Sequence, residues 1–493
     1  MRKLILVFLF FNQLSFASFD MNENMERSYS HIINLEFDKA AVLLDNEQFQ
    51  NPRNGFILLH RNYIDFLTIF INEDITFFES KKHFKEERIS LLDEYDETSP
   101  YFLYTKAEIT LQWAFSRLRF EQYFIAAYEI IESYNLLREN SRRFPNFTLN
   151  NKGIGLIHAL LGLVPDNFQW LINIAGLEGG VSMGISELDA VLNDDRFIIY
   201  EDEILFLLSF FEIHLGNNDS LCQSYLDRIG DRYKESLLLN FAAARLSYNL
   251  GENDHCITIL SNRPDYSGKA KFYHLDYLMG MSYLYMLDYE NAKQRFKYFL
   301  EKFGGINYIK SANHKLAWIA LLQDDYEKAR IYFERVLIDG NNIIDEDKVA
   351  FKNAQRKNSI HIILLRSRLL YDGGYYSLAL SELTRMESSV DVLSNCNQIE
   401  YWYRLARVSS KLKYSDDIIL LYYKKVLEKE LAISSYYAPM SALQVGLIYE
   451  ERGDFQQGEF YFNQCLSMSD FDYERAIHKR AKAGLNRILI SKT

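Results

Sequence analysis

Helix-turn-helix units recur through the C-terminal half of the chain, and this recurrence constrains the fold more than any other feature. In one unit Gly280 and Tyr283 precede a turn at Asp288, and Ala292 and Phe296 follow it. The glycine allows two helices to approach closely, the aromatic rings fill the space between them, and the alanine lies where no larger side chain fits. The pattern therefore predicts pairs of packed helices.

The unit is repeated, with a marker residue near the start of each second helix. Successive markers are 35, 36, 37, 50, 39 and 40 residues apart, and a turn signal precedes each marker. The step of 50 contains a polar insertion at 339–347, which we expect to be a mobile loop on one face of the array. The markers are Leu221, Cys256, Ala292, Ala329, Ala379, Ile418 and Gly458.

Small and aromatic residues at these positions, with a period of about 34 residues, resemble the tetratricopeptide repeat (TPR) family. The resemblance implies an all-α fold, an α-solenoid of TPR-like helix-turn-helix repeats in which each unit packs mainly on its neighbours. It also implies a non-enzymatic scaffold or adaptor that binds a protein or peptide. We expect a TPR-like array at 201–493, closed by an amphipathic helix at 473–490 with a polar outer side.

Residues 18–200 form a separate predicted domain of helical hairpins, because apolar residues recur there at the helix period. Its segment 151–190 is apolar and rich in glycine. Close helix packing or a turn explains these glycines, which include Gly184, better than a nucleotide site does. The expected helices before this segment are 28–35, 37–44, 56–71, 74–94, 101–118 and 120–140.

A second resemblance concerns the centre of this domain. A small-residue helix at 153–165, an apolar helix at 168–175 and a glycine-rich turn at 176–180 are similar to the eukaryotic inclusion-body clearance family of TPR proteins, over roughly residues 30–195. Those relatives lack an export signal, so their intracellular roles are not carried over to this chain.

The N-terminus predicts export. A basic pair, Arg2-Lys3, precedes the apolar run from Leu4 to Phe11, and small residues at Ser15 and Ala17 complete a signal peptide at 1–17. The apolar run is shorter than the about 20 residues needed to span a bilayer, which makes an uncleaved anchor the weaker alternative. We therefore expect a periplasmic or envelope-associated protein, without a transmembrane segment after signal removal but with peripheral association open.

No catalytic, cofactor or metal motif is present in the sequence. The ten histidines form no HExxH pair, the four cysteines form no CxxC pair, and there is no phosphate-binding loop. The net charge of −12 without a basic stripe disfavours nucleic acid as a partner. The cysteines are expected to be buried and free, with a Cys222–Cys256 disulfide as the alternative, and an enzyme site within 100–195 is the weakest reading.

The TPR resemblance implies that the first helix of each repeat lines an inner, partner-binding wall. Aromatic and arginine side chains there are the types that anchor partners, although packing between repeats is the competing explanation. The alternative partner is carbohydrate or peptidoglycan, stacked on Trp318 and serving an outer-membrane assembly. The wall candidates are Tyr277, Met281, His314, Trp318, Arg368, Tyr371, Tyr403 and Arg407.

Overall fold

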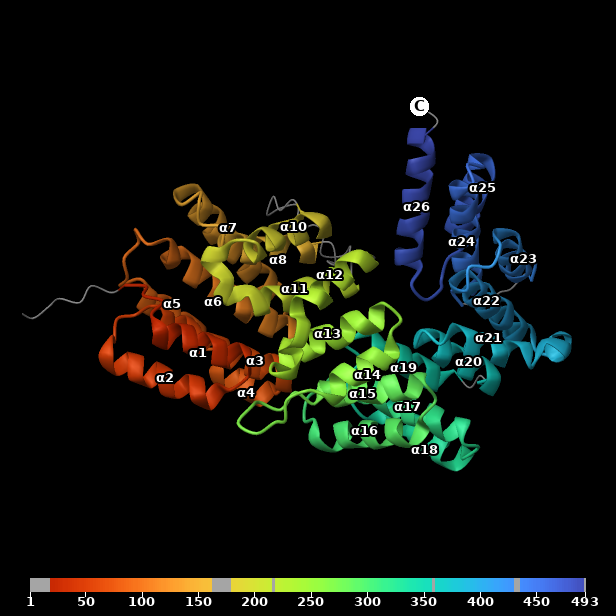
Figure 1. Ribbon diagram of the computed structural model, residues 1–493, viewed down its shortest axis with the longest axis horizontal. Coiled ribbons are helices and arrows are strands. Elements are labelled where there is room, and N and C mark those ends of the chain that lie inside the picture. Colours follow the sequence, from red (N-terminus) through yellow and green to blue (C-terminus); the bar gives the residue numbers. More distant parts are fainter. Residues whose placement is uncertain (1–17, 162–178, 215–217, 357–359, 430–434, 492–493) are drawn as a thin grey trace, which may run out of the picture. The chain divides into compact units, whose positions relative to one another are not determined.

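The computed structural model describes residues 18–161, 179–214, 218–356, 360–429 and 435–491 (Figure 1). Within these ranges the chain is helical and contains no strand beyond an isolated bridge between Ser18 and Asn54. The predicted all-α fold is therefore confirmed. The predicted signal peptide and the apolar helix at 168–175 lie outside the described residues.

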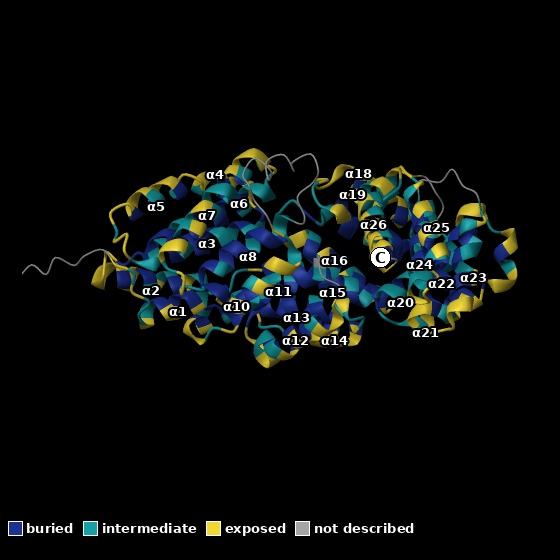
Figure 2. Cartoon of the chain, turned by 90° about the horizontal axis from the view of Figure 1, so that it is seen from above, coloured by how far each residue is buried: buried dark blue, intermediate teal, exposed yellow. Residues whose placement is uncertain are grey.

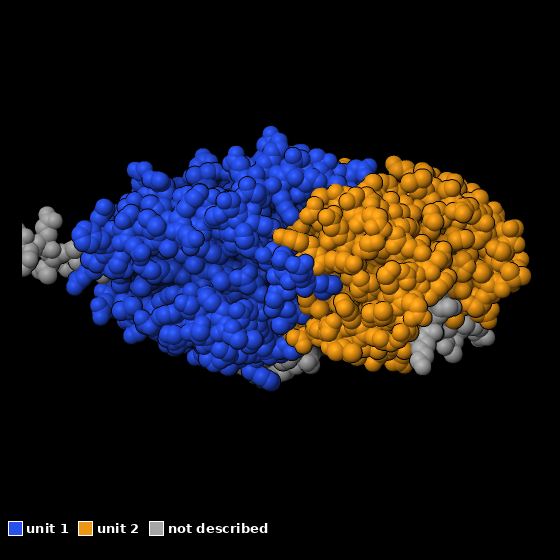
Figure 3. Space-filling view, turned by 90° about the horizontal axis from the view of Figure 1, so that it is seen from below, with its two compact units in different colours: residues 1–250, 254–275, 299–307 blue, residues 251–253, 276–298, 308–493 orange. Residues whose placement is uncertain are grey.

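The helices form two compact units (Figure 3). The first comprises residues 1–250, 254–275 and 299–307, and the second comprises residues 251–253, 276–298 and 308–493. In both units the buried residues lie on the sides of the helices that face other helices (Figure 2). The domain boundary near residue 200 stays a prediction.

The N-terminal helices follow the predicted order with one difference. The segment expected as a single helix over 74–94 is two helices, because a turn at 82–83 directs Lys85 and Arg88 towards buried carboxylates. The helices are α1 (Glu23–Ile33), α2 (Phe37–Gln50), α3 (Phe56–Asn72), α4 (Ile75–Lys81), α5 (Phe84–Leu92), α6 (Pro100–Arg119), α7 (Tyr123–Arg143) and α8 (Asn150–Leu161).

A close helix crossing follows in the first unit. A Cβ atom added to Gly184 would overlap the backbone of Gly155 and Ala159 on α8, so close packing explains this glycine as predicted. The next helical segments along the chain are α10 (Val181–Leu192), η2 (Asp195–Tyr200), α11 (Glu201–His214), α12 (Asp219–Ile229), η3 (Gly230–Lys234), α13 (Leu237–Asn249) and α14 (Asn253–Ser261).

The later helices form pairs whose first members stack on one another. The first helices of successive repeats, α17, α20, α22 and α24, contact one another in that order. The predicted closing helix is present as α26. The helices are α15 (His274–Tyr285), α16 (Tyr289–Lys302), α17 (Ile309–Leu322), α18 (Tyr326–Ile338), α19 (Asp345–Gln355), α20 (Ile362–Asp372), α21 (Tyr376–Thr384), η4 (Glu387–Val392), α22 (Asn395–Lys411), α23 (Asp416–Leu427), α24 (Tyr437–Glu451), α25 (Phe455–Leu466) and α26 (Glu474–Ser491).

The marker position is the fourth residue of each second helix, and it is buried every time. The prediction is correct for five of the seven markers, whereas the other two, Leu221 and Ile418, lie one residue before the buried position. Cys222 is fully buried in place of Leu221, and Ile419 is 5% exposed while Ile418 is 38% exposed. Both helices begin at an aspartate, Asp219 and Asp416, and counting from that start gives the correct register.

The predicted mobile loop at 339–347 is wrong in part, because the extra residues contain the start of a helix, α19. Asp347 is fully buried, and its carboxylate accepts hydrogen bonds from the backbone N–H groups of Tyr308 at 2.7 Å and Ser311 at 2.8 Å. These donors lie at the N-terminus of α17, where a negative charge is favourable. The insertion is therefore fastened to the preceding repeat.

Replacing Asp347 by alanine is expected to destabilise the second unit by about 2 kcal/mol, the upper end for loss of a helix cap, because two N–H groups lose their acceptor. Chemical unfolding followed by helical circular dichroism measures the loss. The matched control is Asp345→Ala on the same helix, whose side chain is 84% exposed and should change stability by less than about 0.5 kcal/mol. Equal effects of the two substitutions would contradict the capping role.

Candidate functional site

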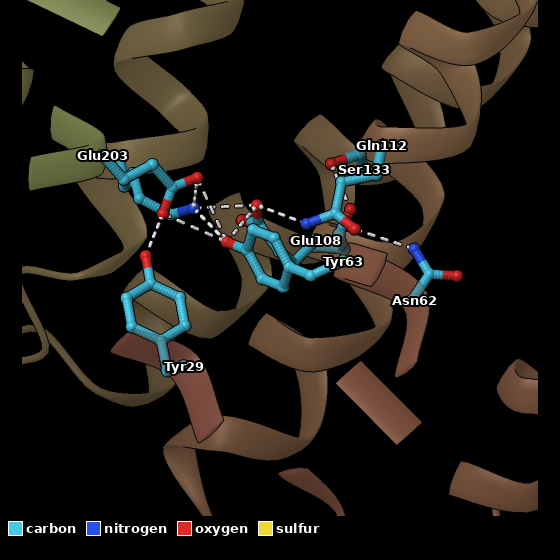
Figure 4. A network of polar contacts seen from close by, with 9 residues as sticks. Tyr29, Asn62, Tyr63, Glu108, Gln112, Ser133 and Glu203 are labelled. Carbon is cyan, nitrogen blue, oxygen red and sulfur yellow. Dashed lines mark hydrogen bonds and ion pairs between the residues drawn. The ribbon is translucent and has the colours of Figure 1, made fainter. Parts of the chain in front are cut away.

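A buried charged network lies within the first unit (Figure 4). The ammonium group of Lys152 on α8 is 2.8 Å from a carboxylate oxygen of Glu108 on α6 and 2.9 Å from one of Glu203 on α11. It also donates to the hydroxyl of Tyr63 on α3 at 2.8 Å. Tyr29 on α1 donates to Glu203 as well. The network joins five helices through side chains that are far apart in the sequence.

The surroundings of Lys152 explain its charge state. Burial alone would lower the pKa of Lys152, but the carboxylates of Glu108 and Glu203 outweigh burial and raise that pKa above its ordinary value. Burial followed by the same carboxylates raises the pKa of Tyr63 well above 10, so its hydroxyl stays neutral. The network thus holds one cation between two anions, a structural arrangement.

An enzyme site within residues 100–195 would need polar groups that converge in a pocket open to substrate. Lys152 and Glu108 of the network do converge there, but a substrate could not reach them. The Lys152 side chain is 2% exposed and that of Glu108 is 5% exposed. Among the described residues, no group of three or more His, Cys, Asp or Glu side chains could hold a metal ion. Burial of this kind is the property of a core that joins helices.

A second feature is a strip of cations and aromatic rings along the first helices of the second unit, which we call the inner strip. Lys315 on α17 lies 3.9 Å from the centre of the Trp318 ring, and Arg368 on α20 lies 5.1 Å from the same ring. Arg407 on α22 lies 4.0 Å from the centre of the Tyr371 ring. The inner strip consists of Lys315, Trp318, Arg368, Tyr371, Tyr403 and Arg407.

The inner strip continues towards the C-terminus through aromatic contacts. The Tyr403 ring is 4.8 Å from that of Tyr437 and 5.8 Å from that of Tyr436, both at the start of α24. Tyr436 in turn is 5.5 Å from Tyr473, next to α26. One continuous line of side chains therefore crosses successive repeats from α17 onwards.

The eight wall candidates divide by exposure. Tyr277, His314, Trp318 and Tyr403 are between 1% and 4% exposed, and they pack between repeats. The other four are half-buried and keep part of their surface in solvent. This second group is Met281, Arg368, Tyr371 and Arg407, and three of its members belong to the inner strip.

Trp318 offers no free face to a sugar. Its ring is 4% exposed and has Lys315 and Arg368 within cation–π distance. The ring therefore orients two cations, which removes the basis for expecting carbohydrate stacking at this residue.

Lys315 was missed by the sequence reasoning. It precedes Trp318 by three residues on a helix, a spacing that places both side chains on one face, and this was the available signal. Burial, followed by the nearby charge of Arg368, lowers the pKa of Lys315 to about 7. Among the described residues Lys315 has no ion-pair partner, and neither does Arg407.

None of the four cysteines forms a disulfide, so the alternative of a Cys222–Cys256 bond is wrong. Cys222, Cys256 and Cys465 are buried as predicted, whereas Cys396 is exposed because it lies in the first turn of α22. Burial raises the pKa of Cys465 to about 11, which keeps its thiol protonated.

No helix within the described ranges combines the length and the apolar character needed to cross a membrane. This finding concerns the described helices alone, and the predicted export signal stays an expectation.

Comparison with known proteins identifies repeats in the second unit. The tetratricopeptide repeat model matches residues 311–337, which lie in α17 and α18, and residues 441–472, which begin in α24 and extend past α25. No curated protein matches the chain. The resemblance of the centre of the chain to the inclusion-body clearance family stays a prediction.

Two solved structures are similar over most of their length. The crystal structure of the APC/C hetero-tetramer Cut9-Hcn1 has 10% identity and a TM-score of 0.28, with 95% of this chain and 96% of that chain covered. The crystal structure of yeast Tom70 has 12% identity and a TM-score of 0.25, with 92% and 96% covered. With the family match, the helix pairs establish that the second unit of this all-α chain contains tetratricopeptide repeats.

Proposed function

We propose that the chain is a non-enzymatic scaffold of the cell envelope that binds a protein or peptide along the inner strip. The observation that supports this function is the continuity of the strip across α17, α20 and α22, the first helices of successive repeats, which contact one another. Arginine and tyrosine are the residue types that dominate binding energy at interfaces.

The envelope part of the proposal depends on the predicted signal peptide. Cell fractionation should recover a mature chain that starts after residue 17 from the envelope fraction. Recovery of an unprocessed chain from the cytoplasm would remove this part and leave the binding role standing.

The binding part is tested with a matched pair of double variants. Tyr371→Ala/Arg407→Ala removes two half-buried members of the inner strip, and loss of one hot spot costs about 2 kcal/mol or about 30-fold in affinity. The control, Tyr326→Ala/Arg330→Ala, removes the same residue types from α18, where both side chains are more than 60% exposed.

The experiment is affinity capture from envelope extracts with the native chain and both variants, followed by measurement of the affinity of the captured protein. We expect the strip variant to lose a partner that the native chain and the control retain. Equal retention by all three chains would overturn the proposed surface. Circular dichroism verifies that both variants stay folded.

A further inference from the structure

We propose that the inner strip binds an extended acidic peptide, with carboxylate side chains of the peptide placed against Lys315, Arg368 and Arg407. This inference rests on the proposed function and adds the chemical class of the partner. It follows from the charges on the strip, their missing partners and their spacing.

The strip carries more positive charge than its own carboxylates neutralise. Arg404 is paired with Glu400, and Arg368 is 3.6 Å from Asp372. Lys315 and Arg407 have no ion-pair partner among the described residues, and both are half-buried. Three cations of the strip, Lys315, Arg368 and Arg407, therefore face two carboxylates, Asp372 and Glu346, although the chain as a whole has a net charge of −12. A local positive surface on an acidic protein attracts an anionic partner.

The cations are also held in place before a partner arrives. Trp318 contacts both Lys315 and Arg368, and Tyr371 contacts Arg407. These rings fix the positions of the charged groups without neutralising them, since an aromatic ring carries no net charge. Preorganised charges lose less conformational entropy on binding, so the strip is suited to recognise carboxylates.

The spacing favours a peptide in extended conformation. Lys315, Arg368 and Arg407 come from three successive first helices, and packed helices lie about 8–10 Å apart. An extended chain advances about 3.3 Å per residue, so an acidic residue at about every third position would meet one cation after another. Nucleic acid fits less well, because it needs a continuous cationic track that this acidic chain lacks.

Proton uptake provides an independent signature. Lys315 is faced by Arg368 and Asp372 from α20, by Glu346 from α19 and by His314 on its own helix, and its pKa is about 7. A peptide carboxylate beside Lys315 would raise that pKa, so the complex takes up a proton near neutral pH. The affinity should therefore decrease as pH rises through 7.

The test selects ligands from a display library of random peptides about 12 residues long, a length that spans about 40 Å when extended. The full chain is the target. The selected sequence is then synthesised with an amidated C-terminus, together with a version in which glutamine and asparagine replace each glutamate and aspartate. Amidation ensures that side-chain carboxylates carry the effect.

Two matched variants complete the design. Lys315→Gln/Arg407→Gln removes two unpaired cations from the strip, and Lys328→Gln/Arg330→Gln removes two cations from exposed positions on α18. Binding is compared at about pH 6, below the pKa of Lys315 of about 7, where both variants change the net charge by nearly the same amount. We expect the strip variant to bind the acidic peptide about 100-fold more weakly, about 10-fold for each lost cation, and the control to bind within about 2-fold of the native chain.

The outcomes separate this inference from the proposed function. Selected peptides that are neutral or basic, but still depend on Arg407, would overturn the acidic partner and leave peptide binding intact. If no selected peptide depends on the strip for binding, both the acidic partner and the proposed function are overturned. Strip-dependent binding of a thymidine oligonucleotide in preference to acidic peptides would assign the surface to nucleic acid. If the strip variant fails to fold, the salt dependence of binding to the native chain tests the inference instead. The affinity for the acidic peptide must fall as the salt concentration rises, while the affinity for the amide version stays constant.

Discussion

Replacing Lys152 by methionine is expected to destabilise the first unit by about 3–5 kcal/mol, because the substitution leaves two buried carboxylates without their cation. Methionine has a similar length, so the loss comes from charge rather than from a cavity. Urea unfolding of the full chain, followed by helical circular dichroism, should show the transition of the first unit at a lower urea concentration.

The matched control is Lys82→Met in the same unit. The side chain of Lys82 is 45% exposed and pairs with Glu79 on the surface, so we expect a change below about 0.5 kcal/mol. A rescue variant adds Glu108→Gln and Glu203→Gln to Lys152→Met and removes the uncompensated charges. Recovery of most of the lost stability would establish that charge is the cause, and an undiminished loss would contradict it.

The raised pKa of Lys152 predicts that the stability of the first unit decreases at alkaline pH. The pKa of Lys152 is raised above its ordinary value of 10.5 in the folded chain, so the stability it contributes is fully present below that pH. The contribution is lost as pH rises through the higher folded pKa, because the neutral amine no longer compensates Glu108 and Glu203. The Lys152→Met variant should lack this loss.

Replacing Gly374 by alanine is expected to destabilise the second unit by about 2–5 kcal/mol, the combined effect of backbone strain and overlap. Gly374 lies in the turn between α20 and α21 with φ of +81°, a left-handed conformation that costs a side chain about 1–2 kcal/mol. The added Cβ would also overlap the carbonyl group of Gly251, whose position it must displace.

Gly453 provides a control for the cost of the left-handed backbone conformation without any overlap of the added Cβ. It occupies the corresponding turn between α24 and α25 with φ of +77°, and a Cβ there would meet nothing within 4 Å. Gly453→Ala should therefore cost only about 1–2 kcal/mol. The difference between the two thermal midpoints measures the close approach at Gly374, and equal midpoints would contradict it.

The repeat architecture could be predicted because its determinants are local. A marker such as Ala292 or Ala329 follows a turn by a fixed number of residues, and both are buried where two helices of one repeat meet. The two register errors arose because Leu221 and Ile418 are apolar neighbours of the buried residue, and composition alone does not separate neighbours. Counting from the aspartate at which each of these two helices begins identifies the buried residue.

The charged network and the inner strip could not be predicted in full, because they depend on contacts between distant residues. Lys152 in an apolar, glycine-rich helix was a signal that a cation is buried there, but its partners lie 44 and 51 residues away. Four of the eight wall candidates are half-buried, and the other four pack between repeats. The position of a residue within its repeat predicts the helix face on which its side chain lies. The exposure of that side chain depends on how the next repeat packs against it.

The large sequence separation between members of the network affects how the first unit folds during synthesis in the cell. Tyr29 and Glu203 are separated by 174 residues, so the interaction that joins α1 to α11 forms only after both have left the ribosome. Ordinary solenoids fold outward from any pair of neighbouring repeats. Here the nascent N-terminal helices must wait for α11 while synthesis continues at about 5–20 residues per second. High contact order slows folding, and the delay gives chaperones a defined interval in which to act.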